Sequence, residues 1–268
     1  MLGDVLWLPA SLALYFAAAA AAVVPAWRGV GAYRLPMLLL VAALSSHGVA
    51  IGLRWARLEH GPYVDLFEIL SSNVWSLHFA VLAACFAVPR IRPALAATLP
   101  LLQVLVLWLL TVSPSDTVAP VTYATIWLPV HVTLGKVFLG CAVVATGISI
   151  AILLRRCAGR AFTALPGDAA LDEIAYRFVL VAFIFESLML VAGAVWAQDA
   201  WGRYWAWDPL ETWTFVTWLA VIAYLHLHAL RRPPPALGAL MVIGIFVLAF
   251  STFFGMPFVS IAPHQGAI

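Results

Sequence analysis

The sequence predicts an all-α polytopic membrane protein of about eight transmembrane helices, with both termini on the outer (periplasmic) face. Hydrophobic residues make up 65% of the 268 residues, charged residues make up only 10%, and the mean hydropathy is +1.02. Soluble domains of this length do not have that composition. The chain is therefore expected to lie in a lipid bilayer.

Eight stretches are long and apolar enough to cross a bilayer, because a helical span needs about 20 apolar residues. They cover residues 5–25, 35–53, 66–88, 93–112, 130–154, 174–197, 213–230 and 237–256. No internal repeat is visible, and the spans leave no room for a separate soluble domain. We therefore expect residues 1–268 to form a single membrane domain.

The distribution of arginine predicts the orientation of these spans. Four connections should share one side of the membrane: residues 26–34, 89–92, 155–173 and 231–236. They hold nine arginines, whereas the opposite connections hold only Arg54, Arg57 and Arg203. Basic connections remain on the cytoplasmic side. Because no Lys or Arg precedes the first apolar run, that run reads as a first span with its N-terminus outside, not as a cleaved signal peptide.

Charge and cysteine content exclude two other functional classes. The formal net charge is only +2, which provides no basic surface for nucleic acid. Cys85, Cys141 and Cys157 form no Cys-x-x-Cys pair, so the chain is unfit for thiol–disulfide relay by itself.

Aromatic and charged residues concentrate in residues 201–213, on the predicted outer face. The stretch holds four tryptophans, one tyrosine and three charged residues. A membrane-interface belt is one interpretation, but belts commonly carry only about one or two Trp or Tyr per helix end. The other interpretation is a surface that holds a flat ligand, because large aromatic faces stack well on a porphyrin. Arg203 could then pair with a propionate.

Part of this stretch has the order of a helix start. Asp208 would be the N-cap, Pro209 the first helical residue, and Glu211 would reach back as in a capping box. We therefore expect Asp208 to be structural first, by fixing the direction in which Trp205 and Trp207 project.

Two histidines flank this stretch on the same predicted face. His131 stands at the outer mouth of the fifth span, and His264 lies a few residues beyond the outer end of the eighth. Axial ligation of a haem iron requires two such imidazoles from separate helices. A lone histidine near a membrane interface is more often a solvated polar residue, so both interpretations stay open.

Other polar residues lie deeper in the spans. His226 and His228 lie roughly 20 Å below Trp213, and because they are two apart on a helix only one can face a given site. His47, His78, Lys136 and Glu186 also lie within spans, where an ionisable group must be paired, neutral or wet. The sequence assigns these four no role.

The tryptophan-rich stretch resembles the WWD signature of the haem-handling proteins of cytochrome c biogenesis, and most closely that of the CcsA-type subunit of cytochrome c synthase. The matching residues are Trp201, Gly202, Trp205, Trp207, Asp208, Pro209, Glu211, Thr212 and Trp213. Residues 61–68 with Ser72 and Asn73, and residues 171–177, are similar to two further segments of that family. The resemblance covers roughly residues 50 to 264.

The resemblance implies a haem-handling subunit in a bacterial inner membrane, with its active face periplasmic. Haem b, preferably reduced, would be moved or presented at the outer face for thioether attachment to a Cys-x-x-Cys-His apocytochrome c. A ResB-like membrane protein would be the partner. No residue of the chain would be catalytic, because the thiols of the apocytochrome add to the haem vinyl groups.

The resemblance also implies a set of haem-binding residues. His131 and His264 stand where the outer iron ligands of the family stand, and His226 matches a lower ligand whose opposite ligand comes from the partner. The outer-face loop, residues 198–212, would bind the ring together with the start of the next span, through Trp201, Arg203, Trp205, Trp207, Asp208 and Trp213.

Two alternatives belong to other classes. A CcmC-like haem carrier would present haem without attaching it, although that type is shorter than eight spans. A membrane scaffold would use its tryptophans only as an interface belt.

Overall fold

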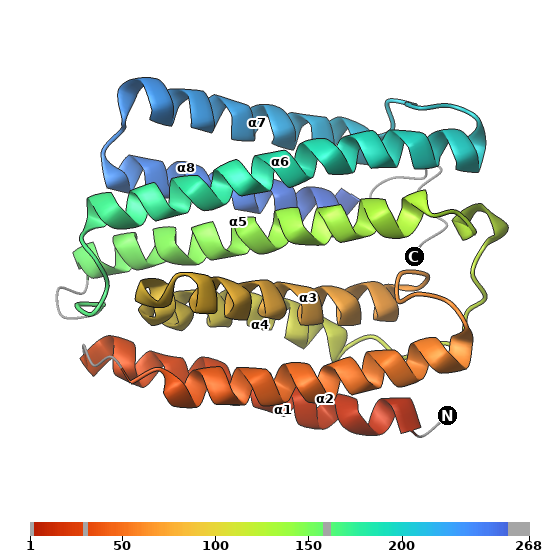
Figure 1. Cartoon of the computed structure of the whole chain (residues 1–268), viewed down its shortest axis with the longest axis horizontal. Helices are drawn as coiled ribbons and strands as arrows, with labels where there is room; N and C mark the ends of the chain where they lie inside the picture. Colours follow the sequence, from red (N-terminus) through yellow and green to blue (C-terminus); the bar gives the residue numbers. More distant parts are fainter. Residues whose placement is uncertain (1–2, 29–31, 158–161, 257–268) are drawn as a thin grey trace.

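In the residues that the structure describes, eight helices run back and forth along the long axis of the protein (Figure 1). The computed structural model describes residues 3–28, 32–157 and 162–256. Its helices are α1 (Gly3–Arg28), α2 (Arg34–Leu58), α3 (Leu66–Ala87), α4 (Leu95–Leu109), α5 (Trp127–Cys157), α6 (Asp168–Trp201), α7 (Pro209–Arg231) and α8 (Pro235–Phe250). All eight are long and apolar enough to cross a membrane, when η1 (Pro89–Ala94) is counted with α4 and the π-helix η3 (Ser251–Gly255) with α8. Within these residues there is no strand, so the predicted fold class is confirmed.

Each predicted span lies on one of these helices, and the differences are at the helix ends. α5 has 31 residues and α6 has 34, so at 1.5 Å per residue both exceed the roughly 30 Å hydrocarbon core. Apolarity marks only the part of a helix that crosses lipid. The polar ends of α6, residues 168–173 and 198–201, therefore lie outside the predicted span, and the second of them carries Trp201.

The start of α6 has no side-chain cap. Asp168 and Asp172 are of a residue type that commonly caps helices, but the N-cap is Gly167, which makes no side-chain capping bond. Asp168 instead forms ion pairs with arginines at the end of α5, and Asp172 lies buried one turn inside the helix. Asp168 is thus paired with arginines, and Asp172 is paired with the imidazole of His228, so neither carboxylate caps the helix.

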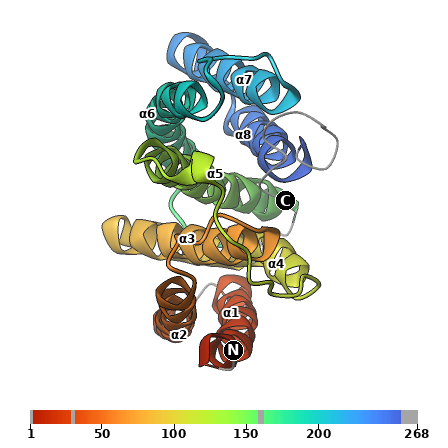
Figure 2. The same cartoon turned by 90° about the vertical axis from the view of Figure 1, so that its right-hand side faces the viewer.

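The helices pack as three groups, seen end-on in Figure 2. α1 and α2 lie side by side, α3 and α4 lie in the middle, and α5 packs between this middle group and the α6–α8 group. Small residues allow the close approach of α5 to α3: a Cβ added at Gly140 would lie 2.5 Å from the Cβ of Ala80. α7 lies at the periphery, against α6 and α8.

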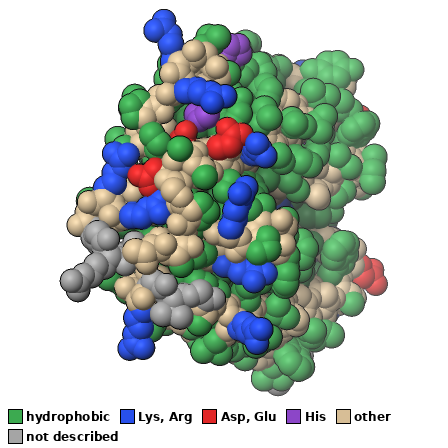
Figure 3. Space-filling view, turned by 60° about the vertical axis from the view of Figure 1, so that its left-hand side comes forward, with side chains coloured by type: hydrophobic (Ala, Val, Ile, Leu, Met, Phe, Trp, Pro, Cys, Tyr) green, Lys and Arg blue, Asp and Glu red, His purple; other side chains and the backbone are tan. Residues whose placement is uncertain are grey.

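Arginines gather at one end of the bundle (Figure 3). Basic residues occupy the last turns of α1, α5 and α7 at that end, and η1 adds two more. The described parts of the four basic connections therefore share one end, as predicted. The start of α1, the end of α8 and the α6–α7 loop lie at the opposite end (Figure 1).

Candidate functional site

The loop between α6 and α7 is fixed by the N-terminal cap of α7. The Asp208 carboxylate accepts a hydrogen bond from the Glu211 backbone N–H at 2.8 Å, and Pro209 occupies the first turn. The Glu211 carboxylate accepts one from the Ala206 N–H at 2.7 Å. The predicted capping role of Asp208 is confirmed. These bonds hold Trp207 in the left-handed backbone region, with φ at 57°, which is a costly conformation for a bulky residue.

Replacing Asp208 by alanine is expected to lower the free energy of unfolding by about 1 kcal/mol, because the cap bond is lost. Asp208→Ser is the matched control, since serine caps comparably without the charge. Thermal unfolding of the purified protein in detergent measures both. Equal loss in the two variants would show that the charge, rather than the cap, matters.

The aromatic residues of the loop fall into an inward and an outward set. Trp201 packs edge-on against Trp196, with ring centroids 5.0 Å apart. Trp205 is half-buried and packs edge-on against Trp207 at 5.7 Å. Trp207 is 68% exposed and Trp213 is 42% exposed. Arg203 is also exposed in this loop. The loop and the start of α7 therefore carry two exposed tryptophans, Trp207 and Trp213, and two partly buried ones, Trp201 and Trp205.

His131, in the second turn of α5, is held in one orientation by α6. Its Nδ1 donates a hydrogen bond to the Met189 carbonyl at 2.9 Å, and its ring stacks on Trp196 with centroids 6.1 Å apart. Donation from Nδ1 places the lone pair of the neutral ring on Nε2, the arrangement that metal-ligating histidines use. Gly193 makes room for this ring, since an added Cβ would lie 2.7 Å from His131 Nδ1 and Cε1.

A partly open crevice joins His131 to the tryptophan-rich loop. Its volume is about 60 Å³, and its lining comes from α5, α6, α7, the loop and the π-helix η3 (Ser251–Gly255) that follows α8. The lining residues include His131, Gly193, Trp196, Trp205, Glu211 and Phe253. This volume has room for only a few water molecules and is too small to enclose a porphyrin. A porphyrin would therefore lie across the mouth of the crevice, with only an edge or substituent inside.

The three predicted iron ligands have different outcomes. His131 lines the crevice. His264 lies outside the described residues. His226 is exposed on α7, where its Nδ1 donates to the Ile222 carbonyl at 3.2 Å, and it is not part of this crevice. Of the four signature tryptophans, Trp205 lines the crevice and Trp207 packs against it. Trp201 packs against Trp196, and Trp213 is exposed.

Several residues of the site were not found from the sequence. Met189, Gly193 and Phe253 lie in apolar spans without a distinguishing pattern, and Thr122 and Tyr123 lie in the 3-10 helix η2 (Val121–Tyr123). Gly193 carries one usable signal, because a glycine inside a membrane helix favours close approach of a neighbour. Burial raises the pKa of Tyr123, whose ring packs edge-on against Trp196 at 6.0 Å.

Buried polar residues in the other half of the bundle form a separate cluster. The Tyr15 hydroxyl bonds His47 Nδ1 at 3.3 Å, and His47 Nε2 bonds the Ser71 hydroxyl at 2.9 Å. His78 donates from Nδ1 to the Val74 carbonyl at 2.7 Å and stacks on Tyr15. In the described ranges no group of three or more His, Cys, Asp and Glu side chains is arranged to hold a metal ion. These residues tie α1, α2 and α3 together.

The chain matches known proteins over most of its length. The model of the cytochrome c assembly protein family matches residues 8–261. The cytochrome c biogenesis protein CcsA of Synechococcus sp. (strain CC9605) is 30% identical over 265 residues, which covers 86% of each chain. CcsA of Prochlorococcus marinus (strain MIT 9515) is 27% identical over 243 residues, covering 79% of this chain and 77% of the relative.

Two further matches cover less of the other protein. CcsA of Prochlorococcus marinus (strain MIT 9312) is 40% identical over 95 residues, which is 35% of this chain and 31% of the relative. The solved structure of the cytochrome c haem lyase CcmF superposes with a TM-score of 0.74 at 20% identity. The match covers 94% of this chain and 46% of CcmF, so this chain spans about half of CcmF and shares its fold.

Proposed function

This chain belongs to the cytochrome c assembly protein family as a CcsA-type, multi-pass membrane protein of cytochrome c biogenesis, and we propose that it is the haem-handling subunit of a cytochrome c synthase. It moves or presents haem b, with the iron preferably reduced, at the outer face of a bacterial inner membrane. We propose that the arginine-rich end is cytoplasmic by the positive-inside rule, and that the crevice, the start of α1 and the end of α8 are on the periplasmic side. A ResB-like membrane protein is the proposed partner, and apocytochrome c is the acceptor.

The observation that carries this proposal is the fixed imidazole of His131 beneath the tryptophan-rich loop. The bond from Nδ1 to Met189 orients the ring and places the acceptor lone pair on Nε2, the nitrogen that we propose ligates the iron. His264 is the proposed opposite ligand. The exposed faces of Trp207 and Trp213 offer stacking surfaces at the mouth of the crevice, and Arg203 offers a charged partner for a propionate.

The reaction places few chemical demands on the chain itself. Haem supplies two vinyl groups, and each apocytochrome thiol adds across one of them to form a thioether. His131, with the tryptophans Trp201, Trp205, Trp207 and Trp213, holds and orients the ring so that its edge is accessible. The Asp208 cap keeps that surface in place. We propose no nucleophile or general base from this chain.

Co-expression tests the synthase activity. The full chain, the ResB-like partner and a reporter apocytochrome are expressed in a strain that lacks other maturation systems. We expect covalent haem on the reporter, detected after denaturing electrophoresis. Haem bound to the chain without covalent haem on the reporter would favour the CcmC-like carrier instead. Purified protein with no Soret absorbance under haem-replete conditions would favour a scaffold.

His226 and His228 take opposite orientations on α7, as their spacing required. His228 is buried; its Nε2 lies 2.8 Å from an Asp172 carboxylate oxygen and its ring stacks on Tyr176. His226 faces outward from the bundle. We propose that His226 binds haem lower in the membrane, with the opposite ligand supplied by the partner.

The two histidines should therefore respond differently to substitution. His228→Ala is expected to destabilise the protein by about 3–5 kcal/mol, because it leaves Asp172 buried without its partner. His226→Ala should change stability by less than about 0.5 kcal/mol but lower the haem retained with the partner. Thermal unfolding and pyridine haemochrome assays measure the two effects. Unchanged haem content in His226→Ala would remove this residue from the ligand set.

A further inference from the structure

The connection between α4 and α5, residues 110–126, is tied to other elements at two places. We propose that it is a strap that positions His131, and that Arg54 anchors it. This inference rests on the proposed role of His131 and assigns a task to residues 61–68, which the proposed function leaves unused. Three sets of contacts support it: those of Arg54, the hydrogen bonds of the strap to Asp65 and His60, and the contact of the strap with Trp196 beside His131.

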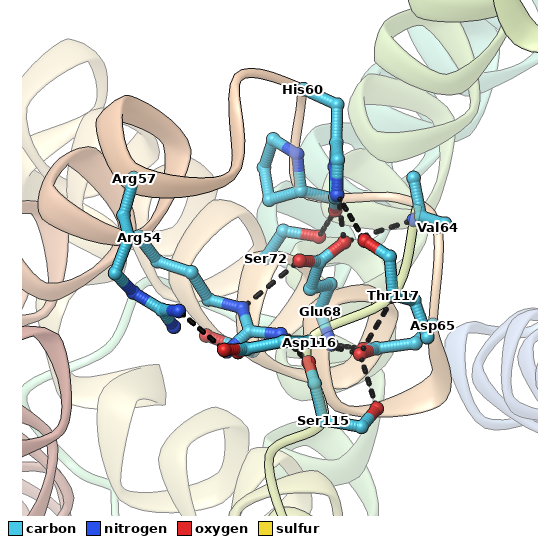
Figure 4. A network of polar contacts seen from close by, with 12 residues as sticks. Arg54, Arg57, His60, Val64, Asp65, Glu68, Ser72, Ser115, Asp116 and Thr117 are labelled. Atoms are coloured by element: carbon cyan, nitrogen blue, oxygen red, sulfur yellow. Dashed lines mark hydrogen bonds and ion pairs between the residues drawn. The ribbon is translucent and has the colours of Figure 1, made fainter. Parts of the chain in front are cut away.

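The anchor is a buried arginine near the end of α2 (Figure 4). Arg54 is 6% exposed, and its Nε donates to a Glu68 carboxylate oxygen at 2.9 Å. Its Nη2 donates to an Asp65 carboxylate oxygen at 3.3 Å and also to the backbone carbonyl of Ser115. Its guanidinium lies 5.1 Å from the centre of the Phe67 ring. The anchor therefore joins α2, α3 and the strap through one side chain.

The two carboxylates are themselves fixed by the start of α3. Asp65 accepts a hydrogen bond from the Glu68 N–H at 2.7 Å, and Glu68 accepts one from the Val64 N–H at 3.1 Å. This pattern resembles a capping box, except that Glu68 accepts from the residue before the N-cap Asp65 and not from Asp65 itself. Because each carboxylate is already held by backbone, the position of Arg54 between them is rigid.

Further hydrogen bonds attach the strap to Asp65 and His60. The hydroxyls of Ser115 and Thr117 donate to the same Asp65 oxygen at 2.8 and 3.3 Å. His60 Nε2 donates to the Thr117 carbonyl at 2.9 Å. Figure 4 shows these groups converging on Asp65 and Glu68. Charge-assisted bonds of this kind are stronger than neutral ones, so this is a firm attachment.

The far part of the strap contacts the side chain that stacks on His131. Trp196 donates from its indole N–H to the Thr122 carbonyl at 3.3 Å, and Tyr123 packs against the same indole. Thr125 donates to Asp199 at 3.1 Å and accepts a bond from the Trp127 N–H, where α5 begins. The strap thus holds Trp196, which lies parallel to the His131 ring.

The strap has almost no regular secondary structure that could fix its position. Its only regular segment is η2, a single 3-10 turn, so its course depends on its attachments. Arg57 also contacts the strap, through a 2.7 Å pair with exposed Asp116 whose hydrogen bond lowers the pKa of that carboxyl. Exposed pairs contribute little. Arg54, rather than Arg57, is therefore the positioning residue.

A double substitution loosens the strap without unpairing the buried charges. Ser115→Ala with Thr117→Val removes both hydroxyl bonds and leaves Arg54 with Asp65 and Glu68. Haem is titrated into the purified full-length protein with its partner, in a His226→Ala background so that the outer site is observed. We expect the affinity for haem to fall about tenfold, as for other groups that orient a metal ligand, with a changed axial-ligand spectrum. Ser115→Ala with Thr117→Ser should restore part of the affinity.

Two controls separate positioning from general damage. Thr111→Ala alters the same strap at an exposed residue whose hydroxyl donates to the Trp108 carbonyl, and Arg57→Gln removes the exposed pair. Both should bind haem as the parent does. An unchanged affinity and spectrum in the double variant overturns the strap proposal. His131→Gly is measured alongside: if it too binds normally, the proposed function has failed, and if it alone loses haem, only the strap proposal has failed.

Discussion

Replacing His131 by glycine is expected to empty the outer haem site and to lower covalent haem on the reporter cytochrome by at least about tenfold, since the loss of an iron ligand should exceed the 10–100-fold effects of supporting groups. The fixed Nδ1 bond to Met189 makes His131 the described residue best suited to ligate iron at the crevice. Pyridine haemochrome assays of the purified protein and haem staining of the reporter measure the two effects.

Added imidazole should restore both, because glycine leaves space for the free ligand where the side chain was. His228→Gly and His60→Gly are poor controls, since the first disturbs a buried pair and the second removes a bond to the strap. Thr111→Ala is the control, because it changes an exposed residue outside the crevice. Haem content equal to wild type in His131→Gly, without imidazole, would refute its ligand role.

Gly193→Ala should have nearly as large an effect on haem binding, with little effect on stability. The new Cβ would lie 2.7 Å from two atoms of the His131 ring. The ring can swing away, but only by giving up its bond to Met189 and its stacking on Trp196. Losing the group that orients a metal ligand costs about 10–100-fold in affinity.

Stability should change little because two effects oppose each other. Alanine favours a helix over glycine by roughly 0.5–1 kcal/mol, and once the ring has moved away, the lost hydrogen bond to Met189 costs about 0.5–1.5 kcal/mol. Gly244→Ala is the matched control, since nothing lies within 4 Å of its added Cβ. Normal haem affinity in Gly193→Ala would show that the ring orientation is not what the site requires.

The fold was largely predictable because lipid imposes a length and a composition on every span. All eight windows lie on helices of the structure. The extended ends of α5 and α6 were not predictable from hydropathy, because they pass out of the apolar layer. The capping role of Asp208 was predictable, because a cap depends on residues three positions apart.

The site was predictable only in part, for a different physical reason. His131 and the tryptophans stand out by residue type, but their neighbours are set by the register between antiparallel helices. Met189 and Gly193 lie about sixty positions from His131, and no local pattern records which turn of α6 faces it. The pairing of Asp172 with His228 was missed for the same reason.

A ligand exchange at His131 tests the central claim most directly. The full-length His131→Met protein, purified with its partner in a His226→Ala background and loaded with haem, is examined by near-infrared magnetic circular dichroism, which distinguishes histidine–methionine from bis-histidine ligation. If His131 binds the iron, the parent shows the bis-histidine signature and the variant shows the histidine–methionine one. A bis-histidine signature that persists in His131→Met would contradict the account.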